Sequence, residues 1–345
     1  MLGSATAESY AAALPPLLAD KRLDALIVLF VPPVVAGADE VAAAIRETVS
    51  RLSPDKPVLA VVISSSGTPA SLLEAGSPVA TFSYPESAAR ALSLAVARSE
   101  WLRRPAGSPP VLEGIDRQAG RRLVDDALAS GGGWLAPAKA RALLEAYGVP
   151  LVGERVVASV EDALDAAGEL GFPVVVKTAV PGAHKTESGG VALDLRTETQ
   201  VREAAERIGA PLIVQAYVSG GAELLAGAVQ DPVLGPLVAF GPGGVLAELI
   251  GEAGFRLAPL DDVDARELVE EGKAGRLVAG FRGAPPADAA GLIDLLLRLS
   301  ALAEDLPEVA ELDLNPVVGL PNRCVAVDAR IRVRPPEAQR SLKTW

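Results

Sequence analysis

This chain has little of what several common protein classes require. It contains a single cysteine, Cys324, so no disulfide can form within the chain. Aromatic residues make up 4% of the sequence although 50% of it is hydrophobic, so its cores must be built mainly from Ala, Val and Leu. Basic residues number 32 against 44 acidic ones, for a net charge of −12. This deficit of positive charge argues against a general binding surface for nucleic acid or anionic membrane.

Long apolar runs are also missing. The most apolar stretch, residues 25–38, is interrupted by Pro32 and Pro33 and is too short to span a bilayer. Residues 1–4 lead into an Ala-rich amphipathic segment without the basic start of a signal peptide. We therefore expect a cytoplasmic protein. Any phosphate site in it must be local, built from a few lysines, backbone amides and a metal ion.

The first hundred residues alternate between helix and strand patterns. The strands are near-continuous apolar runs, which is typical of a parallel sheet covered by helices on both faces. Ligands of such sheets bind beyond the carboxyl ends of the strands, here residues 31–33 and 64–68, although ordinary turns explain these residues equally well. The predicted helices are 7–18, 39–52, 71–75 and 85–98, and the predicted strands are 24–30, 57–63 and 79–82.

The composition changes after a Pro- and Gly-rich stretch at residues 104–110. We expect a first unit over 1–103, a linker over 104–118, a second unit over 119–334 and a charged tail over 335–345. The second unit has a mixed, largely antiparallel α+β pattern. Its predicted helices are 137–147, 160–170, 198–208, 264–272 and 287–304, and its predicted strands are 150–158, 173–177, 191–195, 212–216, 223–230, 233–240, 246–250, 309–314 and 325–331.

The only histidine, His184, follows the predicted strand that ends in Lys177. It precedes Lys185 and lies in a segment closed by the glycine pair Gly189 and Gly190. A lone imidazole beside two lysines in such a segment is a poor core residue. Imidazole nitrogen is nucleophilic at neutral pH and nearby cations favour phosphate oxygens, so His184 is a candidate carrier of a phosphoryl group.

Near the C-terminus, polar residues alternate with leucines. Glu311, Asp313 and Asn315 are predicted to share one face of a strand. Asp328 lies thirteen residues after Asn315 in another apolar run. Oxygen ligands from adjacent strands suit Mg²⁺, which takes one or two protein oxygens together with phosphates and water. A solvated polar strand face explains the same spacing equally well.

Three further features each admit a functional and a structural explanation. Gly243 and Gly244 would let backbone amides approach an anion, or would form a tight turn. Glu223 opens a predicted strand and could accept hydrogen bonds from ribose hydroxyls. Lys177, at a strand end, could reach a nucleotide phosphate. Each of these, considered separately, is more often structural than functional.

Taken together and in order, these motifs resemble the ATP-grasp half of the ADP-forming acyl-CoA synthetases, the acetate–CoA ligase relatives of succinyl-CoA synthetase. The resemblance runs from about Ala136 to Arg332, and residues 1–100 are similar to a flavodoxin-like subdomain from the CoA-ligase half of those enzymes. It implies an α/β chain in which a flavodoxin-like parallel-sheet subdomain precedes an α+β ATP-grasp domain. The motifs are Lys177, His184 and Lys185 with Gly189 and Gly190, residues 215–218, Glu223, residues 231–232, 241–244, 255–260 and 311–316, and Asp328.

The resemblance also implies the ligands, ATP or ADP with Mg²⁺. His184 would match the histidine that, in the acetate-type enzymes, briefly carries phosphate beside the nucleotide, whereas succinyl-CoA synthetases lack a histidine there. Small Ala183 departs from the larger apolar residue of many relatives. Lys185 would assist His184. The implied nucleotide contacts are Lys177 at the phosphates, Gly189, Gly190, Gly243 and Gly244 in loops, the hinge from Gln215 to Val218 at adenine and Glu223 at ribose; the implied metal ligands are Asn315, Asp328 and Asp313.

Family members also carry parts that have no counterpart in this sequence. They begin with a CoA-binding domain and hold a second, principal phosphohistidine outside the ATP-grasp domain, whereas His184 is the one histidine here. Residues 1–3 resemble an internal segment of the family. We therefore expect a CoA-binding partner subunit or domain that carries the second phosphohistidine, and no complete acyl-CoA synthesis without it. A homo-oligomer is compatible with the sequence.

Two other functions stay open at this point. Relatives of this architecture are fused to acetyltransferase domains in some bacteria, so a non-catalytic ligand-sensing module associated with a protein acetyltransferase is one alternative. An ATP-grasp carboxylate–amine ligase is the other. The second needs no phosphohistidine, so replacing His184 with alanine would leave its activity largely intact.

Overall fold

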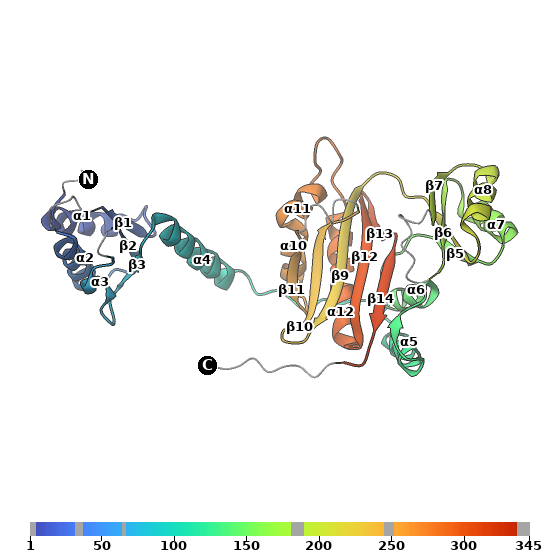
Figure 1. The fold of residues 1–345 in the computed structure, drawn as a ribbon, viewed down its shortest axis with the longest axis horizontal. Coiled ribbons are helices and arrows are strands. Elements are labelled where there is room, and N and C mark those ends of the chain that lie inside the picture. The colour runs from blue at the N-terminus through green and yellow to red at the C-terminus, as the bar shows by residue number, and fades with distance from the viewer. Residues whose placement is uncertain (1–4, 32–36, 64–66, 181–189, 245–251, 337–345) are drawn as a thin grey trace. The chain divides into compact units, whose positions relative to one another are not determined.

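The structure is a computed structural model that describes residues 5–31, 37–63, 67–180, 190–244 and 252–336 (Figure 1). Its contacts divide the chain into two compact units, Met1–Pro105 and Ala106–Trp345. Within the described ranges, no helix combines the length and the apolar character needed to cross a membrane. The two units are described separately below.

The first unit is a three-stranded parallel sheet with helices packed on both faces, as the apolar strand pattern predicted. Its central strand, β2, is buried along its whole length, because α1 and α2 cover one face and α4 covers the other. The elements are α1 (Ala7–Ala19), β1 (Leu26–Phe30), α2 (Ala38–Leu52), β2 (Val58–Val62), α3 (Ala70–Leu73), β3 (Val79–Phe82) and α4 (Pro85–Arg103).

A seven-stranded antiparallel sheet forms the larger part of the second unit (Figure 1). Its strand order is β11-β10-β9-β12-β14-β4, and β13 pairs with β12. The main core lies between this sheet and helices α5, α6, α10, α11 and α12. The strands are β4 (Gly133–Trp134), β9 (Ala222–Asp231), β10 (Gly235–Pro242), β11 (Gly254–Leu257), β12 (Val309–Leu320), β13 (Arg323–Ala326) and β14 (Ala329–Val333); the helices are α5 (Arg117–Ala129), α6 (Pro137–Ala146), α10 (Asp262–Glu270), α11 (Gly272–Val278) and α12 (Ala289–Asp305).

A smaller antiparallel sheet of order β5-β8-β6-β7 completes the second unit, and α7 and α8 pack on it. Both helices have local start and stop signals. The hydroxyls of Ser159 and Thr197 accept the first-turn amides, and Gly171 and Gly209 end the helices at φ +81° and +78°. The elements are β5 (Glu154–Val157), α7 (Val160–Leu170), β6 (Val174–Thr178), β7 (Val191–Leu195), α8 (Glu198–Ile208) and β8 (Leu212–Ala216).

The antiparallel α+β pattern expected for the second unit is confirmed, with local corrections. The single closing strand predicted over 325–331 is wrong, because the chain leaves the sheet at Val327 and Asp328 between β13 and β14. Sequence reasoning missed α5, α11, β4 and β11. The strand predicted over 246–250 lies outside the described residues.

Candidate functional site

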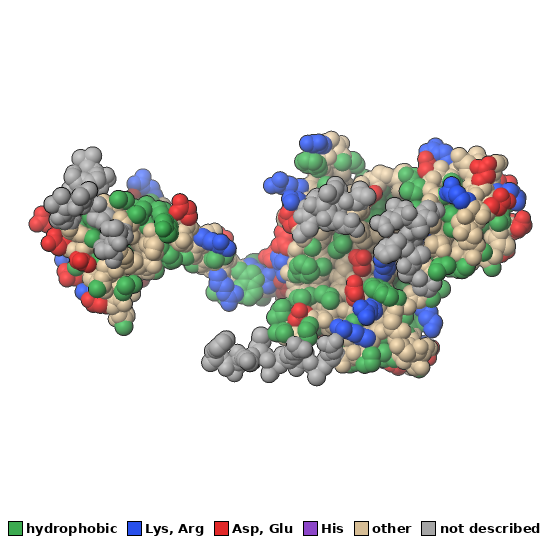
Figure 2. Space-filling model, viewed as in Figure 1, with side chains coloured by type: hydrophobic (Ala, Val, Ile, Leu, Met, Phe, Trp, Pro, Cys, Tyr) green, Lys and Arg blue, Asp and Glu red, His purple; other side chains and the backbone are tan. Residues whose placement is uncertain are grey.

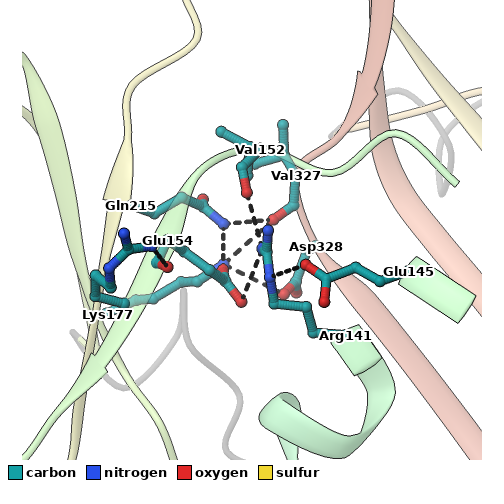
Figure 3. A network of polar contacts seen from close by, with 9 residues as sticks. Arg141, Glu145, Val152, Glu154, Lys177, Gln215, Val327 and Asp328 are labelled. Atoms are coloured by element: carbon teal, nitrogen blue, oxygen red, sulfur yellow. Dashed lines mark hydrogen bonds and ion pairs between the residues drawn. The ribbon is translucent and has the colours of Figure 1, made fainter. Parts of the chain in front are cut away.

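The expected site residues of the described chain gather where the two sheets of the second unit meet. Lys177 on β6 is 5% exposed, and its side chain points across to the break between β13 and β14 (Figure 3). Its Nζ donates to the carbonyl of Val327 at 3.3 Å and lies 3.5 Å from Oδ1 of Asp328. The lysine expected at the nucleotide phosphates and a carboxylate expected at the metal are thus neighbours.

A lysine is buried in the middle of the smaller sheet. All five residues of β6, which lies between β7 and β8, are buried, and Val174 and Val176 pack in the core with residues of α7 and α8. A buried ammonium is costly unless it has hydrogen-bond acceptors or an opposite charge. The Val327 carbonyl and the Asp328 carboxylate supply both, and Lys177 lines a recess together with Glu154 and Asp328.

Gln215 on β8 is the second buried polar residue at this junction, at 1% exposed. Its Nε2 donates to Oε2 of Glu154 at 2.7 Å and to the Val327 carbonyl at 2.9 Å (Figure 3). Arg141 on α6 approaches the other oxygen of Glu154 at 3.6 Å. Sequence reasoning did not select Glu154, Arg141 or Val327, because each reaches the site only through tertiary contacts and none belongs to a spacing motif.

Asn315 lies at an irregular point of β12. The register of β12 against β9 shifts between Leu314 and Val317, where Pro316 has no N–H to donate to a ladder. The Oδ1 atom of Asn315 accepts a hydrogen bond from the backbone amide of Gly244 at 2.8 Å. The backbone amide of Asn315 donates to the backbone carbonyl of Asp328 at 3.2 Å. Asn315 therefore joins the glycine turn to the residue that faces Lys177.

The glycine pair after β10 is closely packed against the start of β9. The amide of Gly243 donates to the carbonyl of Glu223 at 2.9 Å, and a Cβ added to Gly243 would overlap the backbone of Leu224. Gly244 has φ +61°, and a Cβ there would overlap the carboxylate of Glu223. Glu223 itself is exposed. The structure thus brings Glu223, Gly243, Gly244 and Asn315 together.

Asp313 lies on the same face of β12 as Glu311 and Asn315, as the alternation predicted, since Leu312 and Leu314 between them are buried. Burial raises the pKa of the Asp313 carboxyl above its ordinary value. The negative charges of Glu311 and Asp328 act in the same direction, while Arg330 opposes them. A cation bound beside Asp313 and Asp328 would relieve this repulsion.

This donor set fits Mg²⁺. Asp328, Asn315 and Asp313 offer oxygen atoms only, which is the ligand type that Mg²⁺ prefers, and few protein ligands are needed when phosphates and water complete the shell. Over the described ranges, no group of three or more His, Cys, Asp or Glu side chains could hold a metal ion alone.

The expected catalytic pair, His184 and Lys185, lies outside the described residues, as does Gly189. The two ends of that segment are described. The amide of Thr178 donates to the carbonyl of Gly190 at 2.9 Å, and Lys177 pairs with Val191. The chain that carries His184 therefore leaves β6 and enters β7 beside Lys177. Val218 follows β8, two residues beyond its last residue, Ala216.

One face of the larger sheet is charged at this site. The cross-strand pairs Asp313–Arg330 and Glu311–Arg332 place acids and arginines opposite one another on β12 and β14. Figure 2 shows acidic and basic side chains over these strands and apolar side chains over β10, which β9 separates from them.

Comparison with known proteins identifies relatives of the chain. Residues 126–333 match the family model described as an ATP-grasp domain. The chain is 34% identical over 231 residues to the beta subunit of an ADP-forming acetate–CoA ligase I of Pyrococcus furiosus, covering 63% of this chain and 99% of that subunit. It is 32% identical over 344 residues to the ADP-forming acetate–CoA ligase I of Archaeoglobus fulgidus, covering 96% of this chain but 49% of that protein. The chain thus spans about half the length of that relative.

A solved structure also matches more than half of the chain. It is the dinucleotide-forming acetyl-coenzyme A synthetase 1 of Ca. Korarchaeum cryptofilum, in complex with coenzyme A and Mg-AMPPCP, with its phosphohistidine segment pointing towards the nucleotide-binding site. The TM-score is 0.58 at 39% sequence identity, over 62% of this chain and 100% of the matched chain.

Proposed function

The chain belongs to the ADP-forming acetate–CoA ligase family and contains an ATP-grasp domain, and from this premise we propose that it is the nucleotide-handling part of an ADP-forming acyl-CoA synthetase. In this proposal phosphate passes between His184 and the nucleotide. The acyl acid is acetate, the acid named for these relatives.

One observation carries the proposal. The segment with the chain's only histidine is anchored at both ends beside Lys177, through the Thr178–Gly190 hydrogen bond and the Lys177–Val191 pairing. Lys177 in turn faces Asp328. The strand end that leads into the segment with the candidate nucleophile therefore also carries a candidate phosphate-binding cation that faces a candidate metal-binding carboxylate.

The chemistry that these residues support is phosphoryl transfer. An imidazole nitrogen of His184 attacks the γ-phosphorus of ATP, the N–P bond forms, the bond from phosphorus to the bridging oxygen breaks, and ADP leaves with the electron pair. In the direction of ATP synthesis, the β-phosphate oxygen of ADP attacks phosphohistidine by the reverse path. Lys177 and Lys185 balance the phosphate charge. Such transfer depends mainly on positioning and charge neutralisation.

The remaining residues would hold the nucleotide and its metal. Asn315, Asp328 and Asp313 would hold Mg²⁺, which supplies positive charge at the phosphates. Glu223 would accept hydrogen bonds from ribose, the backbone from Gln215 to Val218 would meet adenine, and the amides of the glycine loops would approach the phosphates. The loop glycines proposed for this role are Gly189, Gly190, Gly243 and Gly244.

Acyl-CoA formation requires more than this chain in our proposal. In the direction of acyl-CoA formation, the second histidine of a CoA-binding partner would take the phosphoryl group from His184 and pass it to the acid, and the CoA thiol would then displace phosphate from the acyl phosphate. ATP synthesis from acyl-CoA and phosphate would run the same steps in reverse. The match to a separate beta subunit in one relative and to half of a longer chain in another supports such a division.

Incubation of the purified chain with Mg²⁺ and ATP labelled at the γ-phosphate tests the proposal. We expect acid-labile, base-stable label on His184 and none in the variant His184→Ala. Because the chain has no other histidine, any phosphohistidine must lie at this position. Binding of Mg²⁺·AMPPCP, measured by calorimetry, shows in parallel whether nucleotide binds. Nucleotide binding without label in the presence or absence of a CoA-binding partner would contradict transfer through His184 and favour a sensing module.

A further inference from the structure

The carbonyl oxygen of Val327 accepts hydrogen bonds from two side chains that belong to neighbouring strands of the smaller sheet. Nζ of Lys177 lies 3.3 Å from it and Nε2 of Gln215 lies 2.9 Å from it (Figure 3). Both side chains are nearly fully buried, at 5% and 1% exposed. The amide of Val327 donates to the carbonyl of Pro316 at 3.0 Å. The peptide groups on either side of Val327 are therefore fixed by contacts to both sheets.

The orientation of the Gln215 carboxamide is determined by its surroundings. Its Nε2 has two N–H groups, and these have two acceptors, the Glu154 carboxylate at 2.7 Å and the Val327 carbonyl at 2.9 Å. The reversed orientation would place Oε1 against two acceptors, which have no proton to share. Glu154 is the partner of Gln215 in the β5–β8 register, and its position is constrained by Arg141 at 3.6 Å.

This arrangement controls the residue that follows Val327. Asp328 is the residue after the carbonyl that accepts hydrogen bonds from Gln215 and Lys177. Its carboxylate lies 3.5 Å from Nζ of Lys177. A rotation of the Val327–Asp328 peptide would move the proposed metal ligand away from the proposed phosphate-binding lysine. The side chain of Gln215 thus acts on both groups without needing contact with the nucleotide.

We propose that Gln215 is a positioning residue: its side chain, oriented by Glu154, holds the Val327 carbonyl so that Asp328 and Lys177 are set for a magnesium-bound nucleotide. This inference rests on the proposed function, since it assumes that the site binds nucleotide. It assigns the Gln215 side chain to the protein framework and leaves contact with adenine to the backbone of residues 215–218.

Exchange of the two side chains separates this role from a purely structural one. In Gln215→Glu, two carboxylates meet and both donors are lost, so we expect lower thermal stability and weaker binding of Mg²⁺·AMPPCP. In the double variant Gln215→Glu with Glu154→Gln, the amide of residue 154 can donate to the carboxylate of residue 215. The pair is restored, but no donor faces the Val327 carbonyl. We expect the melting temperature to recover part of the loss seen in Gln215→Glu, because the carboxylate of residue 215 still faces that carbonyl, while affinity stays about tenfold lower, the worth of one net hydrogen bond.

Two further variants complete the design. Gln215→Met removes both donors without adding charge, so it should show the same loss of about tenfold in affinity, which excludes repulsion of the phosphates as the cause. Arg155→Gln changes an exposed residue of the same strand as Glu154 and should bind nucleotide as the unaltered chain does. Calorimetry gives the affinity and differential scanning fluorimetry gives the melting temperature.

The outcomes are distinct. Loss of affinity in the double variant and in Gln215→Met, with stability partly recovered in the double variant, supports the inference. Unchanged affinity in both, or recovery of affinity together with stability, overturns it and leaves the proposed function intact. Failure of the unaltered chain to bind Mg²⁺·AMPPCP overturns the proposed function and this inference together.

Discussion

The ammonium of Lys177 on β6 and the carboxylate of Asp328, between β13 and β14, lie 3.5 Å apart, with the lysine side chain 6% and the aspartate side chain 26% exposed. Each group offsets the charge of the other. A nucleotide with its metal would give both a new partner, phosphate for the lysine and a cation for the aspartate. The ion pair therefore holds a positive and a negative group side by side where the phosphate and the metal ion are expected to bind.

Replacement of Lys177 by methionine should weaken nucleotide binding. A hydrogen bond to a charged group contributes about 1.5–3 kcal/mol, so the dissociation constant of Mg²⁺·AMPPCP should rise roughly 10- to 150-fold in calorimetry. The matched control is Lys273→Met, which removes a lysine from a solvent-exposed pair with Glu252. An equal effect of both substitutions would mean that general charge, and not the position of Lys177, governs binding.

Alanine at position 243 should disrupt the glycine turn. The added Cβ would overlap the backbone of Leu224 in the paired strand, and backbone atoms cannot move aside as a side chain can. We expect a loss of about 1–3 kcal/mol in the free energy of unfolding, measured in urea, and weaker nucleotide binding. Gly168→Ala is the control, because this glycine is inside α7 with open space around it and alanine favours helix there.

Cys324 should react slowly with thiol reagents in the folded protein. Burial raises the pKa of its thiol from 9.0 to about 12, so at pH 8 about one thiol in ten thousand is ionised. Because no other cysteine is present, the absorbance released from DTNB reports on this thiol alone. We expect one equivalent to react promptly in guanidinium and little in native buffer.

The same thiol gives stability a defined dependence on pH. The unfolded chain loses the Cys324 proton near pH 9 and the folded chain retains it to about pH 12, so its contribution to stability falls as the pH rises above 9. The variant Cys324→Ala lacks this pH-dependent contribution to the free energy of unfolding. The difference in unfolding free energy between the two proteins should therefore shift in favour of the variant between pH 8 and pH 10. A constant difference would contradict the raised pKa.

Removal of the Tyr147 hydroxyl should destabilise the second unit. The ring is fully buried, and its hydroxyl donates to Oδ2 of Asp305 at 3.1 Å, an oxygen that Arg117 also contacts at 2.7 Å. Tyr147→Phe should lower the free energy of unfolding by about 1 kcal/mol, because Asp305 retains its arginine partner. Tyr84→Phe changes a ring that is 64% exposed and should have no measurable effect in the same urea titration.

Much of the fold could be predicted from local signals. Helices α7 and α8 begin and end at the predicted residues, because each has a hydroxyl cap and a terminal glycine. Residues 311–315 of β12 follow the predicted alternation, because one face packs on the core. In contrast, α5 buries the small residues Gly120, Val124 and Ala127, which give a weak periodic signal.

The site could be predicted only in part. The motif residues that carry charge or glycine, such as Lys177, Asp328 and Gly244, could be selected from their chemistry and order. The hydrogen bonds of Glu154, Gln215 and Val327 could not, because they join strands far apart in the sequence and one of the acceptors is a backbone carbonyl. A backbone group has no identity in the sequence that a pattern could detect.

The shared Val327 carbonyl has a consequence for the kinetics of ligand exchange. Lys177 on β6 and Gln215 on β8 both donate to the Val327 carbonyl, and Lys177 also contacts the adjacent carboxylate of Asp328. If the smaller sheet moves as a rigid body to admit or release a bulky ligand, these contacts break in a single event and not one after another. Opening is then an all-or-none transition. Nucleotide cannot leave faster than this transition occurs, so the rate constant of opening is an upper limit to the rate constant of nucleotide release.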